Sequence, residues 1–194
     1  MPDQSYGIVV EGDKDIAVYE ELIRKIYPEK LEVVPRQTAG VSGLMRLFPV
    51  LLRDFEHIRQ GRPTDKALVI RDAGSRDPAS VEQQMSEKIQ GRRFSFPRGV
   101  QLFAVRRTME TWLLADEEAV NSVVLSRGGR RVTRIQETLE DIADAKGRFR
   151  RWLSEAKLPF DPQVCREIAR QVKLGTLRYR CPSFRSFERK VTDC

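Results

Sequence analysis

Short apolar runs alternate with stretches of helical periodicity over the first part of the chain. The runs are rich in β-branched residues and have the length of strands. They lie at 6–11, 30–35, 66–72 and 99–106. Apolar residues recur at helical spacing between these runs, over 15–27, 42–60 and 77–90. Alternating strands and helices predict an α/β fold with a four-stranded, mainly parallel sheet flanked by helices on both faces.

The pattern changes after Arg107, where only helical periodicity remains. Gly and Pro residues separate the predicted helices, which cover 108–125, 133–145, 148–157 and 161–174. We therefore expect an α/β core over residues 1–107 and a basic helical C-terminal extension over residues 108–194. The extension is expected to pack on the core as one compact unit. The helix predicted over 42–60 contains Pro49, so we expect it to bend there.

Composition excludes several classes of protein. No apolar run approaches the length that spans a bilayer, and the first residues lack the pattern of a signal peptide, so we expect a cytoplasmic protein without a membrane partner. Three cysteines, Cys165, Cys181 and Cys194, are too widely spaced for a zinc site, and we expect them to be reduced. The single histidine, His57, is expected on a solvent-facing helix surface and leaves little room for a Ser-His-Asp mechanism.

Charge is distributed unevenly along the chain. Residues 1–90 carry 13 basic and 15 acidic side chains, whereas residues 91–194 carry 22 basic and 13 acidic ones. Arginine outnumbers lysine by 26 to 9, and its guanidinium binds phosphate through two donors. A GC-rich genome also enriches arginine, and this alternative stays open for the total. The arginines nevertheless cluster beside glycines and aromatic residues, which predicts contacts with phosphates and stacking on bases. The clusters include Arg92, Arg93, Arg130, Arg131, Arg150 and Arg151.

Two carboxylates follow predicted strands. Glu11 ends the first strand and Asp72 ends the third. Functional groups of an open parallel sheet gather beyond the carboxyl ends of its strands, so we expect these two side chains to converge. Carboxylates without a buried base among them favour a hard divalent cation, Mg²⁺ or Mn²⁺.

Three further acids lie near these strand ends. Asp77 can bind the metal from the loop after the third strand, but it precedes Pro78 at a helix start, which is typical of an N-cap. Asp13 is expected to cap the first helix. Asp15 is either a favourable acid in the first turn of that helix or a further metal ligand, and the two interpretations stay open.

Four motifs carry a resemblance to known families. "VVEGDKD" (9–15) and "LVIRDAG" (68–74) resemble the TOPRIM domain of topoisomerases, primases and OLD-type nucleases, whose first strand ends in Glu-Gly and whose third ends in Asp-x-Asp. "METWLLAD" (109–116) and "CPSFRSF" (181–187) are similar to a bacterial family of unknown function, number 4276. That family is regarded as TOPRIM-like and often accompanies ATPase genes.

The resemblance implies a TOPRIM/Rossmann-like fold and roles for individual residues. Glu11 matches the TOPRIM glutamate, a general base or metal ligand, and Asp72 matches the first Asp of Asp-x-Asp, a metal ligand. The second Asp of that pattern is Gly74 here, which removes one ligand. The glutamate of "METWLLAD", Glu110, recurs in the family of the resemblance, which makes it a candidate metal ligand. Its alternative role is that of an acid at a helix start.

Two function classes are consistent with these residues. The first is a metal-dependent nuclease in which Glu11, Asp72 and Glu110 hold Mg²⁺ or Mn²⁺ and the arginines hold DNA or RNA. The resemblance places such a nuclease in an ATPase-associated phage-defence system. The second class is a catalytically weakened TOPRIM-like module that binds nucleic acid or an ATPase partner. Gly74 favours the second class, and the Glu11–Asp72 pair favours the first.

Overall fold

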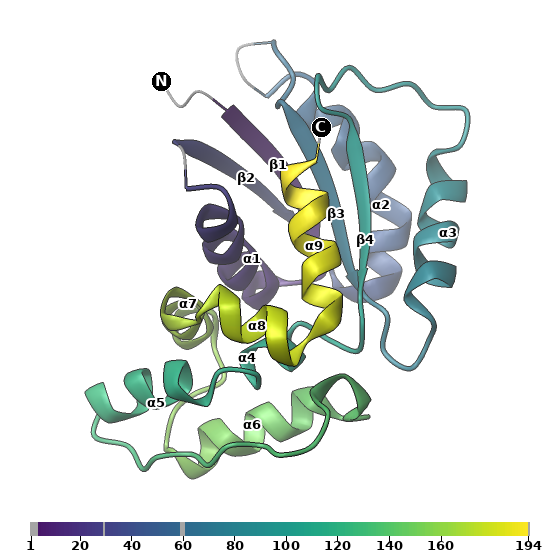
Figure 1. Ribbon diagram of the computed structural model, residues 1–194. Coiled ribbons are helices and arrows are strands. Elements are labelled where there is room, and N and C mark those ends of the chain that lie inside the picture. The colour runs from purple at the N-terminus through teal and green to yellow at the C-terminus, as the bar shows by residue number, and fades with distance from the viewer. Residues whose placement is uncertain (1–3, 29, 59–60, 194) are drawn as a thin grey trace.

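The centre of the molecule is a parallel sheet of four strands. The computed structural model describes residues 4–28, 30–58 and 61–193, and its strands lie in the order β2-β1-β3-β4 (Figure 1). All neighbouring strands are parallel. The bounds are β1 (Gln4–Val10), β2 (Leu31–Gln37), β3 (Lys66–Asp72) and β4 (Val100–Val105). The predicted α/β fold is confirmed.

Helices cover both faces of this sheet. On β1, Ile8 and Val10 point into one hydrophobic core, whereas Val9 points into a second core on the opposite face. The first core is closed by α1 (Asp13–Ile26) and α9 (Pro182–Thr192), and the second by α2 (Gly40–Phe55) and α3 (Pro78–Ile89) (Figure 1). Burial on both faces explains why the strands read as continuous apolar runs and not as alternating ones.

The remaining helices gather around the end of the sheet where β1 and β3 finish (Figure 1). They are α4 (Glu110–Leu113), α5 (Glu117–Ser126), α6 (Ala145–Glu155), α7 (Pro162–Gln171) and α8 (Leu174–Arg180). Their apolar side chains join the core of α1 and α9. Trp112 lies at the centre of this core, with ring centroids 5.0 Å from Phe184 and 5.1 Å from Phe187. Within the described residues, no helix has both the length and the apolarity to cross a membrane.

Two helix predictions in this part of the chain are wrong. The interval 108–125 is divided into α4 and α5, and 133–145 is irregular except for a short 3₁₀ turn, η1 (Leu139–Asp141). Asn121 binds the residue just before the second interval: its side chain accepts the Val132 N–H at 2.8 Å and donates to the Val132 carbonyl at 3.1 Å. In a helix beginning at residue 133, that carbonyl would accept the first hydrogen bond of the helix, and here it is bound by Asn121 instead.

A buried lysine fixes the end of α9 to the start of β3. The Lys66 ammonium donates to the carbonyl oxygens of Lys190 at 2.9 Å and Val191 at 3.0 Å, and also to that of Asp193. The last carbonyls of a helix lack partners within the helix and carry partial negative charge. Lys66 supplies both hydrogen bonds and a compensating charge, which holds α9 against the sheet.

The absence of a side chain at Gly7 lets α2 approach β1 closely. A Cβ atom added at this position would lie 2.5 Å from Cδ2 of Phe55, a buried ring at the end of α2. No side-chain carbon tolerates that distance, so a larger residue at position 7 would force the two elements apart.

Candidate active site

Glu11 and Asp72 meet at the carboxyl ends of β1 and β3. The two strands are adjacent and parallel, and Glu11 directly follows the end of β1 while Asp72 ends β3. The backbone N–H of Asp72 donates to Oε1 of Glu11 at 3.1 Å. Both side chains are half-buried. The predicted convergence of these residues at one end of the sheet is confirmed.

Two further carboxylates reach the same place from neighbouring helices. Asp15 lies in the first turn of α1, where it is half-buried and accepts a hydrogen bond from the Gly12 N–H. Glu110 begins α4 and is only 2% exposed. The residue before it, Met109, donates its backbone N–H to Oδ1 of Asp72 at 3.1 Å, which fixes the start of α4 beside β3. We call Glu11, Asp15, Asp72 and Glu110 the carboxylate cluster.

The charges of the cluster act on one another. Burial and the charges of Glu110 and Glu11 raise the pKa of Asp15 from 3.8 to about 7. Burial and the charges of Asp15, Glu110 and Glu11 raise the pKa of Asp72 well above its ordinary value, against the Met109 N–H. Burial also raises the pKa of Glu11, although hydrogen bonding to Asp72 and the charge of Arg71 oppose this. Crowded carboxylates of this kind hold protons that solvent-exposed acids would lose.

A buried tyrosine lies beneath the cluster. Tyr19 is almost fully buried on α1, and burial together with the charges of all four cluster carboxylates raises the pKa of its phenol well above 10. Its ring packs edge-on against Trp112, with centroids 6.1 Å apart. The sequence predicted a helix over 15–27, which contains Tyr19, but gave no sign that this side chain borders the charged site.

Two cations border the cluster, and sequence reasoning selected neither. Lys146, in the first turn of α6, places Nζ 3.7 Å from Oε1 of Glu110 and lowers the pKa values of Glu11 and Asp15. Arg71 is buried beside Glu11, and its Nε and Nη1 have no hydrogen-bond partner among the described residues. Position 71 lies next to Asp72 in sequence, and that adjacency was the available signal. Lys146 could not be found in the same way, because it lies far along the chain.

The donor chemistry of the cluster fits a divalent cation. Oε2 of Glu110 is buried and has no hydrogen-bond partner among the described residues. The other candidate metal ligands of the cluster are also carboxylate oxygens, which Mg²⁺ and Mn²⁺ prefer. The side chains do not yet form a closed ligand set: across residues 4–28, 30–58 and 61–193, no three His, Cys, Asp or Glu side chains are grouped to hold one ion. Glu11 is held by the Asp72 N–H and Glu110 by Lys146.

Comparison with known proteins adds nothing to this picture. No family model, curated protein or solved structure matches the chain. The resemblance to TOPRIM-like families therefore stays a prediction.

Two other acids singled out in the sequence, Asp77 and Asp13, lie outside the cluster. Asp77 is exposed and caps α3, accepting the Ser80 N–H at 3.0 Å, and its charge is not among the main causes of the shifted pKa values in the cluster. Its prediction as a metal ligand is not supported. Asp13 does not cap α1, because Gly12 is the N-cap and Asp13 binds only the backbone and ammonium of Lys14.

Asp116, the last residue of "METWLLAD", is buried and joins two helices. Its Oδ1 accepts the Ala119 N–H at 3.1 Å and caps α5, while its Oδ2 accepts the Lys173 N–H at 2.8 Å just before α8. The motif thus combines one residue of the carboxylate cluster, Glu110, with several core residues, among them Trp112, and one structural cap, Asp116.

The predicted nucleic-acid contacts are exposed but do not form one surface around the cluster. They are Arg92, Arg93, Arg130, Arg131, Arg150 and Arg151. The first two lie in the loop that leads into the start of β4, at the opposite end of the sheet from the cluster (Figure 1). The second pair follows α5, and Arg131 lies 3.7 Å from Glu118. Only Arg150 shares an element and a helix face with a cluster contact, being four residues beyond Lys146 on α6.

Most aromatic residues near these arginines point inward. Phe149, Trp152, Phe184 and Phe187 are buried, so the expectation that they stack on bases is wrong. Phe160 is the exception near the cluster. It is partly exposed, and its ring lies 5.1 Å from Nζ of Lys14 and 5.0 Å from the guanidinium carbon of Arg150.

Cys165, Cys181 and His57 take no part in the cluster. Cys165 and Cys181 are buried and free, and burial raises the pKa of each thiol to about 12. Cys194 lies outside the described residues. His57 is exposed in the turn after α2 and not within a helix, so its predicted solvent exposure is confirmed.

Proposed function

We propose that this chain is a nuclease that cleaves phosphodiester bonds in nucleic acid with the help of Mg²⁺ or Mn²⁺. One observation carries the proposal: the buried Oε2 of Glu110, which has no hydrogen-bond partner among the described residues, lies beside Asp15 and Asp72, whose pKa values the charge of Glu110 helps to raise. A divalent cation relieves such a cluster more completely than protonation does, because it binds several carboxylates at once.

The chain's own residues have distinct roles in this proposal. Glu11, Asp72 and Glu110 would hold the ion, which supplies charge neutralisation for the scissile phosphate and a more acidic bound water. Asp15, with a pKa of about 7, accepts or releases a proton near neutral pH, which suits a general acid or base. Lys146 pairs with Glu110 at 3.7 Å and offers a positive charge to the phosphate.

The substrate in this proposal is a polynucleotide strand. Within the described residues, Nε and Nη1 of Arg71 are buried beside Glu11 and have no hydrogen-bond partner, and phosphate oxygens are suitable acceptors for them. Near the cluster, the cationic groups of Lys14 and Arg150 both lie over the partly exposed ring of Phe160. Cations beside an exposed ring suit a single strand, whose phosphates and bases contact different groups.

A second candidate function is a nucleic-acid-binding module without catalysis. The specific observation in its favour is Gly74, which replaces the second Asp of the TOPRIM-like pattern, together with the lack of a ready three-ligand group among the described residues. The proposals of an ATPase partner and of a role in phage defence rest on the resemblance alone.

The test measures metal binding and cleavage on the same protein. Mn²⁺ or Mg²⁺ at roughly one hundred times its Kd should stabilise the folded chain by about 2.7 kcal/mol, visible as a rise in melting temperature. Labelled single-stranded RNA and DNA, incubated with Mn²⁺, should be cut. Glu110→Gln should abolish both effects, because the amide keeps the size of the side chain and removes its charge.

Glu155→Gln is the matched control, since Glu155 is an exposed glutamate on α6. It should leave both effects unchanged. Strand binding without any metal-dependent cleavage would favour the binding module, and an equal metal-induced rise in the melting temperature of Glu110→Gln would place the ion elsewhere.

A further inference from the structure

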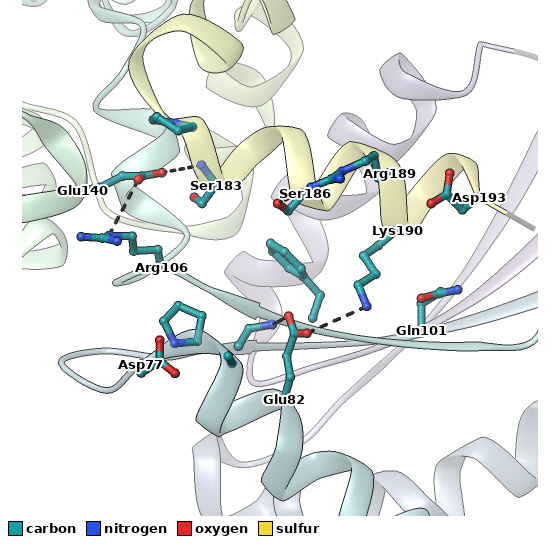
Figure 2. A pocket seen from close by; sticks show the side chains of 15 residues that line it. Asp77, Glu82, Gln101, Arg106, Glu140, Ser183, Ser186, Arg189, Lys190 and Asp193 are labelled. Carbon is teal, nitrogen blue, oxygen red and sulfur yellow. Dashed lines mark hydrogen bonds and ion pairs between the residues drawn. The ribbon is translucent and has the colours of Figure 1, made fainter.

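A groove of about 730 Å³ opens along the outer edge of β4. Figure 2 shows β4 at its base, with α3 on one side and α9 on the other. None of the four carboxylates of the cluster lines this groove. It is therefore a separate surface, and its role is independent of the proposed nuclease function.

The base of the groove is a strand edge with free hydrogen-bonding capacity. In the described part of the chain β4 is the last strand of the sheet. The Gly99 carbonyl accepts the Ala67 N–H at 3.1 Å, and the Val105 carbonyl accepts the Ala73 N–H at 2.9 Å, so these odd-numbered positions face β3. The even-numbered residues between them turn their N–H and C=O groups away from β3, toward the outer edge. These alternate residues are Val100, Leu102 and Ala104, and of the three Ala104 lines the groove. Such an edge is a template for another extended chain.

A side chain already occupies part of this edge. The Ala104 N–H donates to Oε1 of Glu82 at 3.0 Å, and Oε2 of the same carboxylate lies 3.9 Å from Nζ of Lys190 on α9. Figure 2 shows Glu82 reaching from α3 across the edge of the strand toward Lys190. The carboxylate oxygen stands where the carbonyl of a neighbouring strand would accept the Ala104 N–H.

The two walls of the groove carry opposite charge. Asp77 and Glu82 line it from the α3 side, whereas Arg189 and Lys190 line it from α9. Glu140 and Asp193 lie toward its two ends (Figure 2), and Glu140 is already engaged by Arg106 and by the Ser183 N–H. An extended chain beside β4 sends alternate side chains to the two faces of the sheet, and hence to the two walls.

We propose that this groove binds an extended polypeptide segment of alternating acidic and basic residues, which adds to β4 as a fifth strand. Its acidic side chains face Arg189 and Lys190, and its basic side chains face Asp77 and Glu82. A carbonyl of the segment replaces Glu82 on the Ala104 N–H, and Glu82 then pairs with a basic side chain. Main-chain hydrogen bonds provide affinity and the charged walls provide specificity, as in other cases of strand addition.

The probe is a fluorescein-labelled octapeptide of alternating glutamate and lysine, and binding is followed by fluorescence anisotropy. Two N-methylated versions carry methyl groups on the glutamate nitrogens or on the lysine nitrogens. Only every second N–H of an added strand points toward β4, and methylation removes the hydrogen from that nitrogen. The version methylated on the nitrogens that face β4 should therefore bind at least about tenfold more weakly, and the other version about as well as the parent peptide. An octapeptide with its glutamates and lysines in two blocks should also bind at least tenfold more weakly.

Arg189→Glu should weaken binding of the alternating peptide by at least about tenfold, because it reverses a charge on one wall. Arg185→Glu is the matched control, since Arg185 is an exposed arginine of α9 that does not line the groove. Equal binding of the block peptide, equal effects of the two N-methylated versions, or equal effects of the two arginine variants would each overturn the proposal. So would sedimentation showing that the protein forms a dimer through β4 and takes up no peptide.

Discussion

Removing the charge of Asp15 should stabilise the protein at neutral and alkaline pH. In the folded state the pKa of this carboxyl is about 7, against an ordinary value of 3.8. The folded chain therefore binds a proton between pH 4 and pH 7 that the unfolded chain has lost, so stability falls as pH rises through this window. At about 1.4 kcal/mol per pKa unit the full shift corresponds to about 4 kcal/mol, and solvent screening of a half-buried side chain reduces this to about 2–3 kcal/mol.

Asp15→Asn keeps an oxygen for the Gly12 N–H and removes the charge that acts on the rest of the cluster. Urea unfolding at pH 5 and pH 8 measures the effect: the wild type should lose stability between the two values, and the loss should shrink by about 2 kcal/mol in the variant. Asp13→Asn is the matched control, because Asp13 is an exposed acid in the same helical turn. An unchanged loss of stability in Asp15→Asn would refute the assignment of this proton uptake to Asp15.

Three further perturbations test other parts of the structure. Lys66→Met should lower the free energy of unfolding by about 3 kcal/mol in urea titrations, because the carbonyls at the end of α9 lose a charged donor; an unchanged midpoint would contradict this. Gly7→Ala should cost about 2 kcal/mol through overlap with Phe55, and the same assay should show it. Reversing the charges of Arg130 and Arg131 should reduce the log-log salt slope of single-strand binding by about 1.4 if both contact phosphates, and an unaltered slope would remove them from the interface.

Local patterns predicted the four strands, although their partners lie far apart in sequence. Their short apolar runs reflect burial on both faces of the sheet, and this signal survives without any tertiary information. The segment around Val132 shows the limit. Apolar spacing over 133–145 is helical, yet Asn121 binds the backbone of Val132 where that helix would begin, and only the folded chain shows this contact. The helix predicted through 114–116 failed similarly, since Asp116 caps a new helix there.

The site was predictable only where strand ends define it. Glu11 and Asp72 follow from the rule that parallel strands present their carboxyl ends together, and Glu110 came from the resemblance. Lys146 reaches Glu110 from a helix placed by tertiary packing, and no sequence spacing encodes that approach. Asp77 shows the converse, because its position near a strand end suggested a ligand although its local sequence predicted the cap that it forms.

The covering of the sheet by α9 also constrains how the chain is made. Residues 106–181 lie between β4 and the helix that packs on it, so β4 is synthesised well before its cover. Until α9 has left the ribosome, Phe103 and its neighbours on that face stay open to water and to other apolar surfaces. Contacts between distant segments also form slowly, because a long loop must close first. We therefore expect this face of the nascent chain to be the surface that folding factors protect during synthesis.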